Sequence, residues 1–385
     1  MKILFILEGL NESTKIAQPW RHVVEISSRM KKMGHDVEII SEKNDRSKTN
    51  DEVLGVPVNR IKRNKFLLDI KELLYTINNI NPDIINWHCS DVWSSIYFNR
   101  LKKKLKYNTI WTVHSDGILL NDLKNLNLSE FIQLYKFWNN ILNSFAQKTL
   151  VKGWIQAPFL RHTITLSDRT ARTLVNLGLR KEQVTPISSG VDIDTFYPSQ
   201  NSVDDSNILY FGPPSTFRGI DTLYSAFKII KKNIPDSKLI FLSRDLSEKS
   251  NWYKKFGSMD NTKVVCGILP QEDLINYLRE ASVIVLPFKF WPQVSCPLTI
   301  LEGMALGKAI VTTPIGSINE IVRDGETGIL VPAGKADKLS EAIIRLLNDP
   351  SEREKIGKNA RMYVESFHNW DYIVDKTLKV YFKYN

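Results

Sequence analysis

The sequence predicts an α/β protein with two doubly wound parallel-sheet domains that face a central cleft, and three observations lead to this class. Short β-rich runs alternate with longer amphipathic stretches along the chain, which is typical of parallel strands covered by helices on both faces. A length of 385 residues suits two domains. A polar, turn-rich segment, Val191–Asn207, interrupts the alternation midway and marks the linker.

The first half opens with a strand, Lys2–Leu7, and a helix, Pro19–Lys32. Pro19 suits a first helical turn because its missing N–H would have no partner there, and Gly34 ends the helix. The same alternation of strands and helices continues to the linker. Further strands are expected at Asp36–Ile40, Asp83–Trp87, Thr109–His114, Thr163–Leu166 and Gln183–Ile187, and further helices at Phe66–Ile80, Asp91–Lys104, Ser129–Leu150 and Asp168–Leu177.

The second half repeats the alternation and closes with three consecutive helices. Its strands are expected at Ile208–Phe211, Lys238–Leu242, Lys263–Cys266, Val283–Pro287 and Ala309–Thr313. Its helices are expected at Ile220–Asn233, Pro270–Ala281, Leu298–Leu306, Lys338–Asn348, Glu352–Phe367 and Tyr372–Tyr384. Two such halves predict that ligands bind at the carboxyl ends of the strands.

Composition is that of a soluble globular protein, with 43% hydrophobic and 24% charged residues, which excludes a disordered chain. The three cysteines, Cys89, Cys266 and Cys296, form no C-x-x-C pair, so we expect neither a disulfide framework nor a paired-cysteine zinc site. A reducing, cytoplasmic location fits this usage. Apolar runs such as Ala281–Phe288 are far shorter than the ~18–20 residues that span a bilayer.

The net charge of +10 is unevenly distributed. Residues 1–195 hold 28 Lys and Arg against 20 Asp and Glu, an excess of +8, whereas residues 196–385 hold 24 against 22. A basic half is typical of contact with nucleic acid, an anionic membrane or an anionic substrate, but also of a merely well-solvated surface. Because no zinc-finger spacing or RNA-binding strand signature is present, nucleic acid is not expected as a partner.

An amphipathic helix in the same half carries an aromatic stripe that includes Phe131, Tyr135 and Trp138. A stripe at helical spacing packs either in a core or on a membrane surface. The run Lys102-Lys103-Lys104 would add attraction to anionic lipid, although a lysine run at a helix end is also simply solvated. A peripheral position on the inner membrane face is therefore one expectation.

Two segments of the second half carry candidate binding residues. Gly212 ends a strand, and Arg218-Gly219 precede the next helix, so the backbone and the guanidinium can approach phosphate oxygens. An ordinary strand-to-helix turn with a solvated arginine is the alternative. Glu302 lies one turn into an otherwise apolar helix, where a carboxylate needs either a ligand such as a ribose diol or an ion-pair partner.

Several motifs in this order resemble the nucleotide-sugar-dependent glycosyltransferases of family 4, which have the GT-B fold. The match is strongest from Leu301-Glu-Gly-Met-Ala-Leu-Gly307 to Glu320-Ile-Val-Arg-Asp-Gly325. Gly190-Val-Asp-Ile-Asp-Thr-Phe196 and Leu209-Tyr-Phe-Gly212 precede it, and Phe367-His-Asn-Trp370 follows it. The resemblance runs the whole length of the chain.

The resemblance implies a retaining transfer from a nucleoside diphosphate sugar to a glycan or lipid-linked acceptor. The acceptor would bind residues 1–195 and the donor residues 196–369, with the final helix, 370–385, packed back on the first domain. Catalytic roles are implied for Arg218, which would contact the leaving diphosphate, and for His114, near the transferred sugar. Donor-binding roles are implied for Gly212, Arg218, Gly219, Gln293, Leu298, Thr299 and Glu302.

No metal and no cofactor is expected, because in this fold a basic side chain and helix N-termini hold the diphosphate. Asp192-Ile-Asp194 looks like the Asp-x-Asp metal motif of another glycosyltransferase fold, but it falls in the linker motif. An ordinary turn is therefore favoured there over a metal site.

The chain departs from the family pattern at three places. Val294 replaces a glutamate that contacts the donor sugar, Pro213 replaces an arginine, and Ala17-Gln18 replace a glycine pair. A sugar-nucleotide binding protein that has lost transfer is therefore one alternative. A GT-B epimerase is another, but no acidic residue lies between Glu280 and Glu302 to act on the sugar.

Overall fold

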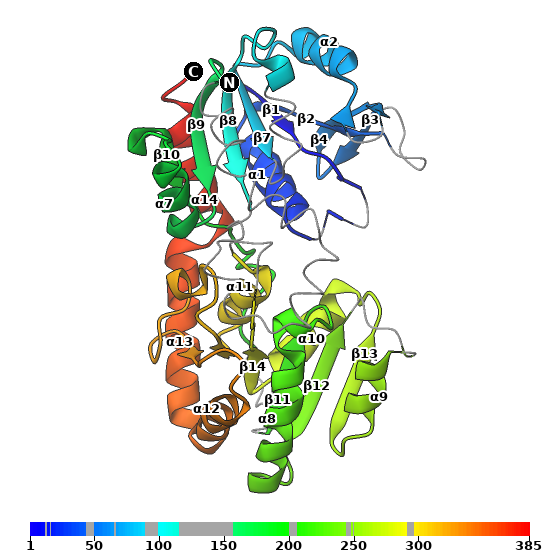
Figure 1. Cartoon of the computed structure of the whole chain (residues 1–385), viewed down its shortest axis with the longest axis vertical. Helices are drawn as coiled ribbons and strands as arrows, with labels where there is room; N and C mark the ends of the chain where they lie inside the picture. Colours follow the sequence, from blue (N-terminus) through cyan, green and yellow to red (C-terminus); the bar gives the residue numbers. More distant parts are fainter. Residues whose placement is uncertain are drawn as a thin grey trace. The chain divides into compact units, whose positions relative to one another are not determined.

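The computed structural model describes residues 1–11, 14–15, 17–43, 50–64, 67–88, 99–114, 157–199, 206–243, 248, 250–290 and 296–385. These residues form two compact units, one from residues 1–189 and 370–385, and one from residues 190–290 and 296–369 (Figure 1). Each unit is built on its own parallel sheet, so the predicted class of two doubly wound α/β domains is confirmed. The expected helix Ser129–Leu150, with its aromatic stripe, lies outside the described residues.

The first unit has an eight-stranded sheet in the order β10-β9-β8-β7-β1-β2-β4-β3, in which only β3 runs antiparallel to its neighbour. Its strands are β1 (Lys2–Ile6), β2 (Asp36–Glu42), β3 (Asn50–Val53), β4 (Val56–Ile61), β7 (Ile84–His88), β8 (Asn108–Val113), β9 (Leu160–Thr165) and β10 (Val184–Pro186). A separate two-stranded ribbon consists of β5 (Arg63–Asn64) and β6 (Leu67–Leu68).

Helices cover both faces of this sheet. They are α1 (Trp20–Lys32), α2 (Ile70–Ile80), α7 (Asp168–Asn176), the 3-10 turn η1 (Lys181–Gln183) and α14 (Trp370–Tyr381). One apolar cluster joins the sheet to α1 and α14, and a second joins its other face to α2 and α7. The last helix, Trp370–Tyr381, therefore belongs to the core of the first unit.

The second unit has a six-stranded, fully parallel sheet in the order β13-β12-β11-β14-β15-β16. Its strands are β11 (Asn207–Phe211), β12 (Lys238–Ser243), β13 (Thr262–Cys266), β14 (Val283–Leu286), β15 (Ala309–Thr312) and β16 (Ile329–Leu330). Its helices are η2 (Thr216–Arg218), α8 (Ile220–Asn233), α9 (Asn251–Gly257), α10 (Gln271–Glu280), α11 (Leu298–Ala305), η3 (Ile318–Glu320), α12 (Ala336–Asn348) and α13 (Pro350–Phe367).

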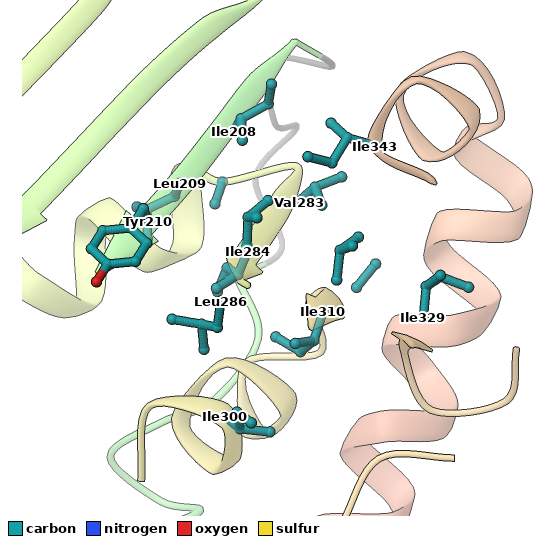
Figure 2. Packing of buried hydrophobic residues seen from close by; sticks show 14 of the residues in the cluster. Ile208, Leu209, Tyr210, Val283, Ile284, Leu286, Ile300, Ile310, Ile329 and Ile343 are labelled. Atoms are coloured by element: carbon teal, nitrogen blue, oxygen red, sulfur yellow. The ribbon is translucent and has the colours of Figure 1, made fainter. Parts of the chain in front are cut away.

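The core of the second unit lies between its central strands and the helices around them. Figure 2 shows Ile284 of β14 and Ile310 of β15 on the side of Ile300 of α11, and Val283 of β14 beside Ile343 of α12. All five side chains are buried. This packing fixes α11 over the middle of the sheet, where the candidate binding residues of that helix lie.

Some elements differ from the sequence expectation, and the reasons are local. The hairpin of β3 and β4 was not predicted, because its turn uses Leu54 and Gly55, both with positive φ, instead of a recognisable Asn-Gly pair. The helix expected from Phe66 begins at Ile70, because the Asp69 side chain accepts hydrogen bonds from the backbone N–H groups of Lys71 and Glu72.

The division between the units falls between Ser189 and Gly190, six residues before the expected boundary after Thr195. The backbone N–H of Val191 donates to the carbonyl of His368, and Val191 and Phe196 are buried in the second core. The start of the expected linker is thus a packed part of the second unit.

Close packing between helices in the second unit depends on glycine. A Cβ at Gly357 of α13 would lie 2.0 Å from the carbonyl oxygen of Gly307, just after α11. Because that neighbour is backbone, it cannot rotate away, and the two helices would have to separate.

We predict that Gly357→Ala destabilises the protein by about 1–3 kcal/mol or more, the usual range for overpacking. Gly257→Ala, at the end of α9, is the matched control, because nothing lies within 4 Å of the Cβ it would add. Chemical unfolding of both variants measures the difference. Equal stabilities would contradict the packing of α13 against Gly307.

Candidate functional site

The strand order of the second sheet determines where a ligand-binding crevice forms. The chain leaves β11 towards β12 on one side and returns to β14 on the other, so β11 and β14 are neighbours at a topological switch point. Ligands of doubly wound sheets bind at the carboxyl ends of the strands at such a point. Gly212 follows β11, and Pro287 follows β14.

Arg218 is buried at this point, with only 5% of its surface exposed. Its guanidinium lies over the Phe288 ring, 4.8 Å from Cζ to the ring centroid. Nη2 is 3.5 Å from the Thr299 hydroxyl at the start of α11. The structure therefore brings Arg218 and Thr299 together, and Arg218 is not the solvated arginine of an ordinary turn.

Two glycines permit this arrangement. A Cβ at Gly212 would lie 2.8 Å from the Arg218 guanidinium carbon, and one at Gly219 would lie 1.8 Å from the Pro287 carbonyl oxygen. Gly219 has φ of 72° and forms the N-cap of α8. The loop after β11 can therefore pack on the end of β14 only because residues 212 and 219 have no side chain.

The helix α11 supplies the other candidate residues of this site. Leu298 and Thr299 form its first turn and are half-buried, while Glu302 lies one turn further and is 5% exposed. Gly303 allows the close approach of α11 to the sheet, since a Cβ there would lie 2.6 Å from Ile310 Cδ1. First-turn N–H groups and a buried carboxylate are thus held on one rigid helix.

Sequence reasoning missed the contribution of Tyr210. Its hydroxyl donates a hydrogen bond of 2.7 Å to the carbonyl of Pro213, and its ring stacks on Phe241. Burial raises the pKa of Tyr210 to about 12, against the opposing effect of Arg218, so the hydroxyl stays protonated. Tyr210 thereby holds the loop at Pro213, where the family pattern has an arginine.

In the first unit, His114 follows β8 and belongs to a cluster of three buried histidines. His114 Nε2 lies 2.8 Å from Nδ1 of His88, the last residue of β7. The ring of His22, from α1, lies edge-on to His114 with centroids 5.1 Å apart, and Trp370 of α14 lies edge-on to His22. The sequence held a signal for His88, because a histidine directly follows the expected strand Asp83–Trp87 and another ends the expected strand Thr109–His114.

Burial lowers the pKa of all three histidines, that of His22 to about 3. The charges that add to this effect at His88 and His114 come from the other histidines of the cluster. Within the described part of the chain, no group of three His, Cys, Asp or Glu side chains is arranged to hold a metal ion.

Asp192 makes a local turn. Its carboxylate accepts hydrogen bonds from the backbone N–H groups of Asp194 and Thr195 and from the Thr195 hydroxyl.

Gln293 and Val294 lie outside the described residues. Among the helices that the structure describes, none is long and apolar enough to cross a membrane.

Two family models match the chain one after the other. The model for "Glycosyltransferase Family 4" matches residues 20–195, and the model for "Glycosyl transferases group 1" matches residues 193–363. The chain belongs to the GT-B glycosyltransferases. The family expected from the sequence motifs is therefore confirmed.

Curated relatives and solved structures agree with this assignment. A D-inositol 3-phosphate glycosyltransferase of Kribbella flavida is 26% identical over 236 residues, 56% of this chain and 54% of that protein. An uncharacterised glycosyltransferase of Methanocaldococcus jannaschii is 24% identical over 303 residues, 76% of this chain and 74% of that protein. The chain thus spans about half the length of the first of these relatives.

Two solved structures show the same fold. A sucrose-phosphate synthase of Thermosynechococcus elongatus superposes with a TM-score of 0.76 at 19% identity, covering 100% of this chain and 99% of that one. HepE of Anabaena, in complex with UDP, superposes with a TM-score of 0.75 at 15% identity, covering 99% of both chains. At these identities the likeness is one of fold.

We predict that the free energy of unfolding falls as the pH is lowered from 7 to 5. The buried histidines stay neutral in the folded chain, because their pKa values are lowered, whereas the unfolded chain binds protons below its ordinary histidine pKa near 6.5. His22→Phe should make this dependence shallower by up to about 1.4 kcal/mol per pH unit. Urea unfolding at several pH values measures the slope.

The control is His35→Gln, because His35 is only half-buried and its pKa is less affected by burial than that of His22. If the free energy of unfolding depends on pH equally in His22→Phe and in the unchanged chain, His22 takes up a proton in the folded state, which contradicts the prediction.

Proposed function

We propose that this chain transfers a sugar from a nucleoside diphosphate sugar to an acceptor hydroxyl with retention of the anomeric configuration. The acceptor oxygen bonds to the anomeric carbon, the bond from that carbon to the diphosphate oxygen breaks, and its electron pair leaves with the diphosphate. The proton of the acceptor hydroxyl departs with the leaving group or to solvent. The protein must therefore stabilise negative charge on the diphosphate.

The observation that carries the proposal is the buried Arg218 at the switch point of the second sheet. A guanidinium that is 5% exposed, lies on an aromatic ring and is flanked by the first turn of α11 is pre-organised for phosphate oxygens. We propose that it replaces a metal ion in charge stabilisation. The binding of UDP by HepE of Anabaena supports a diphosphate at this fold.

We assign the rest of the donor to the residues around Arg218. Gly212 and Gly219 allow the close packing that places Arg218 at the carboxyl ends of β11 and β14, while Leu298 and Thr299 offer first-turn N–H groups for the diphosphate. Glu302, buried on the same helix, would accept hydrogen bonds from the ribose hydroxyls. Gln293 would contact the sugar, and the first unit would hold the acceptor with His114 near the sugar.

We predict that Arg218→Ala lowers kcat by roughly 10²-fold or more, the usual effect of losing a transition-state hydrogen-bond donor. Arg218→Lys should restore activity only in part, because a point charge lacks the planar fork of the guanidinium.

Glu302→Gln should weaken nucleoside diphosphate binding by about 1–3 kcal/mol. Turnover of a panel of nucleotide sugars and calorimetry with the corresponding diphosphates measure these effects.

Arg345→Ala is the matched control, because Arg345 is exposed on α12 of the same unit and forms an ion pair with Glu352 at the surface. Full activity in Arg218→Ala would overturn the assignment. Tight diphosphate binding by the unchanged chain with no release of sugar from any donor would favour the alternative, a sugar-nucleotide binding protein.

We further propose that the acceptor is a glycan or lipid-linked glycan at an anionic membrane surface, which the first unit contacts. The support is the excess of +8 in residues 1–195 and the run from Lys102 to Lys104. Leu101 and Leu105 are buried on either side of this run, while Lys103 and Lys104 are exposed. Each such lysine adds about 1 kcal/mol of attraction to anionic lipid.

Co-sedimentation with anionic liposomes should show binding that weakens as salt rises and that weakens further when Lys102, Lys103 and Lys104 are changed to Gln. The same change of charge at Lys228, Lys231 and Lys232 of α8 is the control and should have less effect. If no protein sediments at low salt, the acceptor is a soluble molecule.

A further inference from the structure

The turn that carries Arg218 is bound to the segment that follows β14, residues 287–290. The backbone N–H groups of Lys289 and Phe290 both donate to the carbonyl oxygen of Phe217, at 2.9 and 3.0 Å. The Phe217 and Phe290 rings pack together, with their centroids 5.7 Å apart. The residue directly before Arg218 is therefore anchored to the 287–290 segment.

An ion pair anchors the chain on the other side of Arg218. Lys289 Nζ lies 2.8 Å from Oδ2 of Asp221, in the first turn of α8. Lys289 also follows Phe288, whose ring lies against the Arg218 guanidinium. Phe217 and Asp221 thus flank Arg218 in the sequence, and Lys289 binds both of them, the first through its backbone and the second through its side chain.

This pair differs from an ordinary ion pair on an exposed surface. The side chain of Lys289 is 20% exposed and that of Asp221 is 38% exposed. Oδ1 of Asp221 is buried, and it has no hydrogen-bond partner in the described part of the chain. A buried carboxylate oxygen needs a compensating charge, which Lys289 supplies. The pair should stay closed, because opening it would leave this oxygen uncompensated.

The stem of Lys289 is confined as well. A Cβ at Gly334, in the loop between β16 and α12, would lie 3.4 Å from Cε of Lys289. The stem therefore runs beside the backbone of a third part of the second unit. Because it is confined on this side, the ammonium reaches Asp221 from a defined direction.

We infer that Asp221 and Lys289 are positioning residues, whose ion pair holds the Arg218 turn against the 287–290 segment and so sets where the guanidinium lies. The inference rests on the proposed function, in which Arg218 stabilises the leaving diphosphate. Such stabilisation depends on donors that are already in place, and displacing a functional side chain by about 1 Å costs up to ~10²-fold in rate. The pair should therefore matter for turnover, although we assign neither side chain a contact with the donor.

Arginine-selective ¹⁵N NMR of the full chain reads this geometry without any substrate. A guanidinium over an aromatic ring lies in the shielding region of that ring, so the Arg218 Nε–H proton should resonate upfield of ordinary arginine signals. Arg218→Lys identifies the signal by removing it. In Lys289→Met, which keeps an unbranched stem but removes the charge, the signal should move towards the ordinary position.

Lys338→Met is the matched control. Lys338 forms an ion pair of the same length, 2.8 Å, with Glu341 on the exposed surface of α12 in the same unit. Its replacement should leave the Arg218 signal and the turnover unchanged. An Arg218 signal that keeps its position in Lys289→Met overturns the inference, and Asp221→Asn provides the same measurement if Lys289→Met does not fold.

Turnover shows whether the pair acts through Arg218. With a donor found active in the panel above, Lys289→Met should lower kcat by roughly 10- to 100-fold and change KM for the donor by less than about threefold. Lys289→Arg, which keeps the charge, should recover most of the loss. In an Arg218→Ala background, Lys289→Met should have little further effect, because the group that it positions is already gone. An equal loss with and without the guanidinium contradicts the inference, since the pair would then act on the fold alone.

The failure of the inference and the failure of the proposed function give different results. Full activity in Arg218→Ala would contradict the proposed role of Arg218 in transfer, while the NMR signal would still decide whether Lys289 holds its side chain. If no donor is turned over, the proposed function fails, and the position of the Arg218 signal in Lys289→Met alone decides the inference.

Discussion

The burial of the Arg218 guanidinium depends on two positions that have no side chain. Gly219 lets the loop after β11 rest against the Pro287 carbonyl at the end of β14, and Gly212 leaves the space that the guanidinium occupies. Phe288, just after β14, and Thr299, in the first turn of α11, then contact Arg218. The arrangement of the whole site follows from this close approach of two neighbouring strand ends.

The first unit uses the same principle with different chemistry. Its strand order also reverses at β1, which has β2 on one side and β7 on the other, so β1 and β7 form the switch point. His88 is the last residue of β7. Here the carboxyl edge holds buried, uncharged imidazoles, whereas in the second unit it holds a buried cation and a buried carboxylate. Two similar sheets thus present a neutral polar surface in one unit and a charged one in the other.

Much of the fold was predictable from the sequence because buried parallel strands and amphipathic helices leave clear periodic patterns. The strands β11, β12 and β14 and the helix α8 lie close to where apolar runs and glycines placed them. The β3–β4 hairpin was not predictable, because Leu54 takes a backbone conformation that its side chain does not favour. Helix α9 was missed because it has only seven residues.

The candidate site was predictable where a motif carried it and unpredictable where only packing reveals it. Arg218, Thr299 and Glu302 lie in recognisable segments, but no sequence pattern places Phe288 under a guanidinium or Tyr210 against Pro213. The pairing of His88 with His114 needs the register of β7 and β8, which is a property of the folded sheet.

The return of α14 to the first unit has a consequence for synthesis of the chain on the ribosome. The first unit is discontinuous, since the second unit lies in the sequence between residues 189 and 370. Trp370 and Tyr381 are buried in its core, and the bond from Asn86 to Tyr381 joins residues 295 positions apart. The first half of the chain is therefore synthesised without the helix that completes one of its two apolar clusters, and α1 covers its part of that face of the sheet before α14 has emerged.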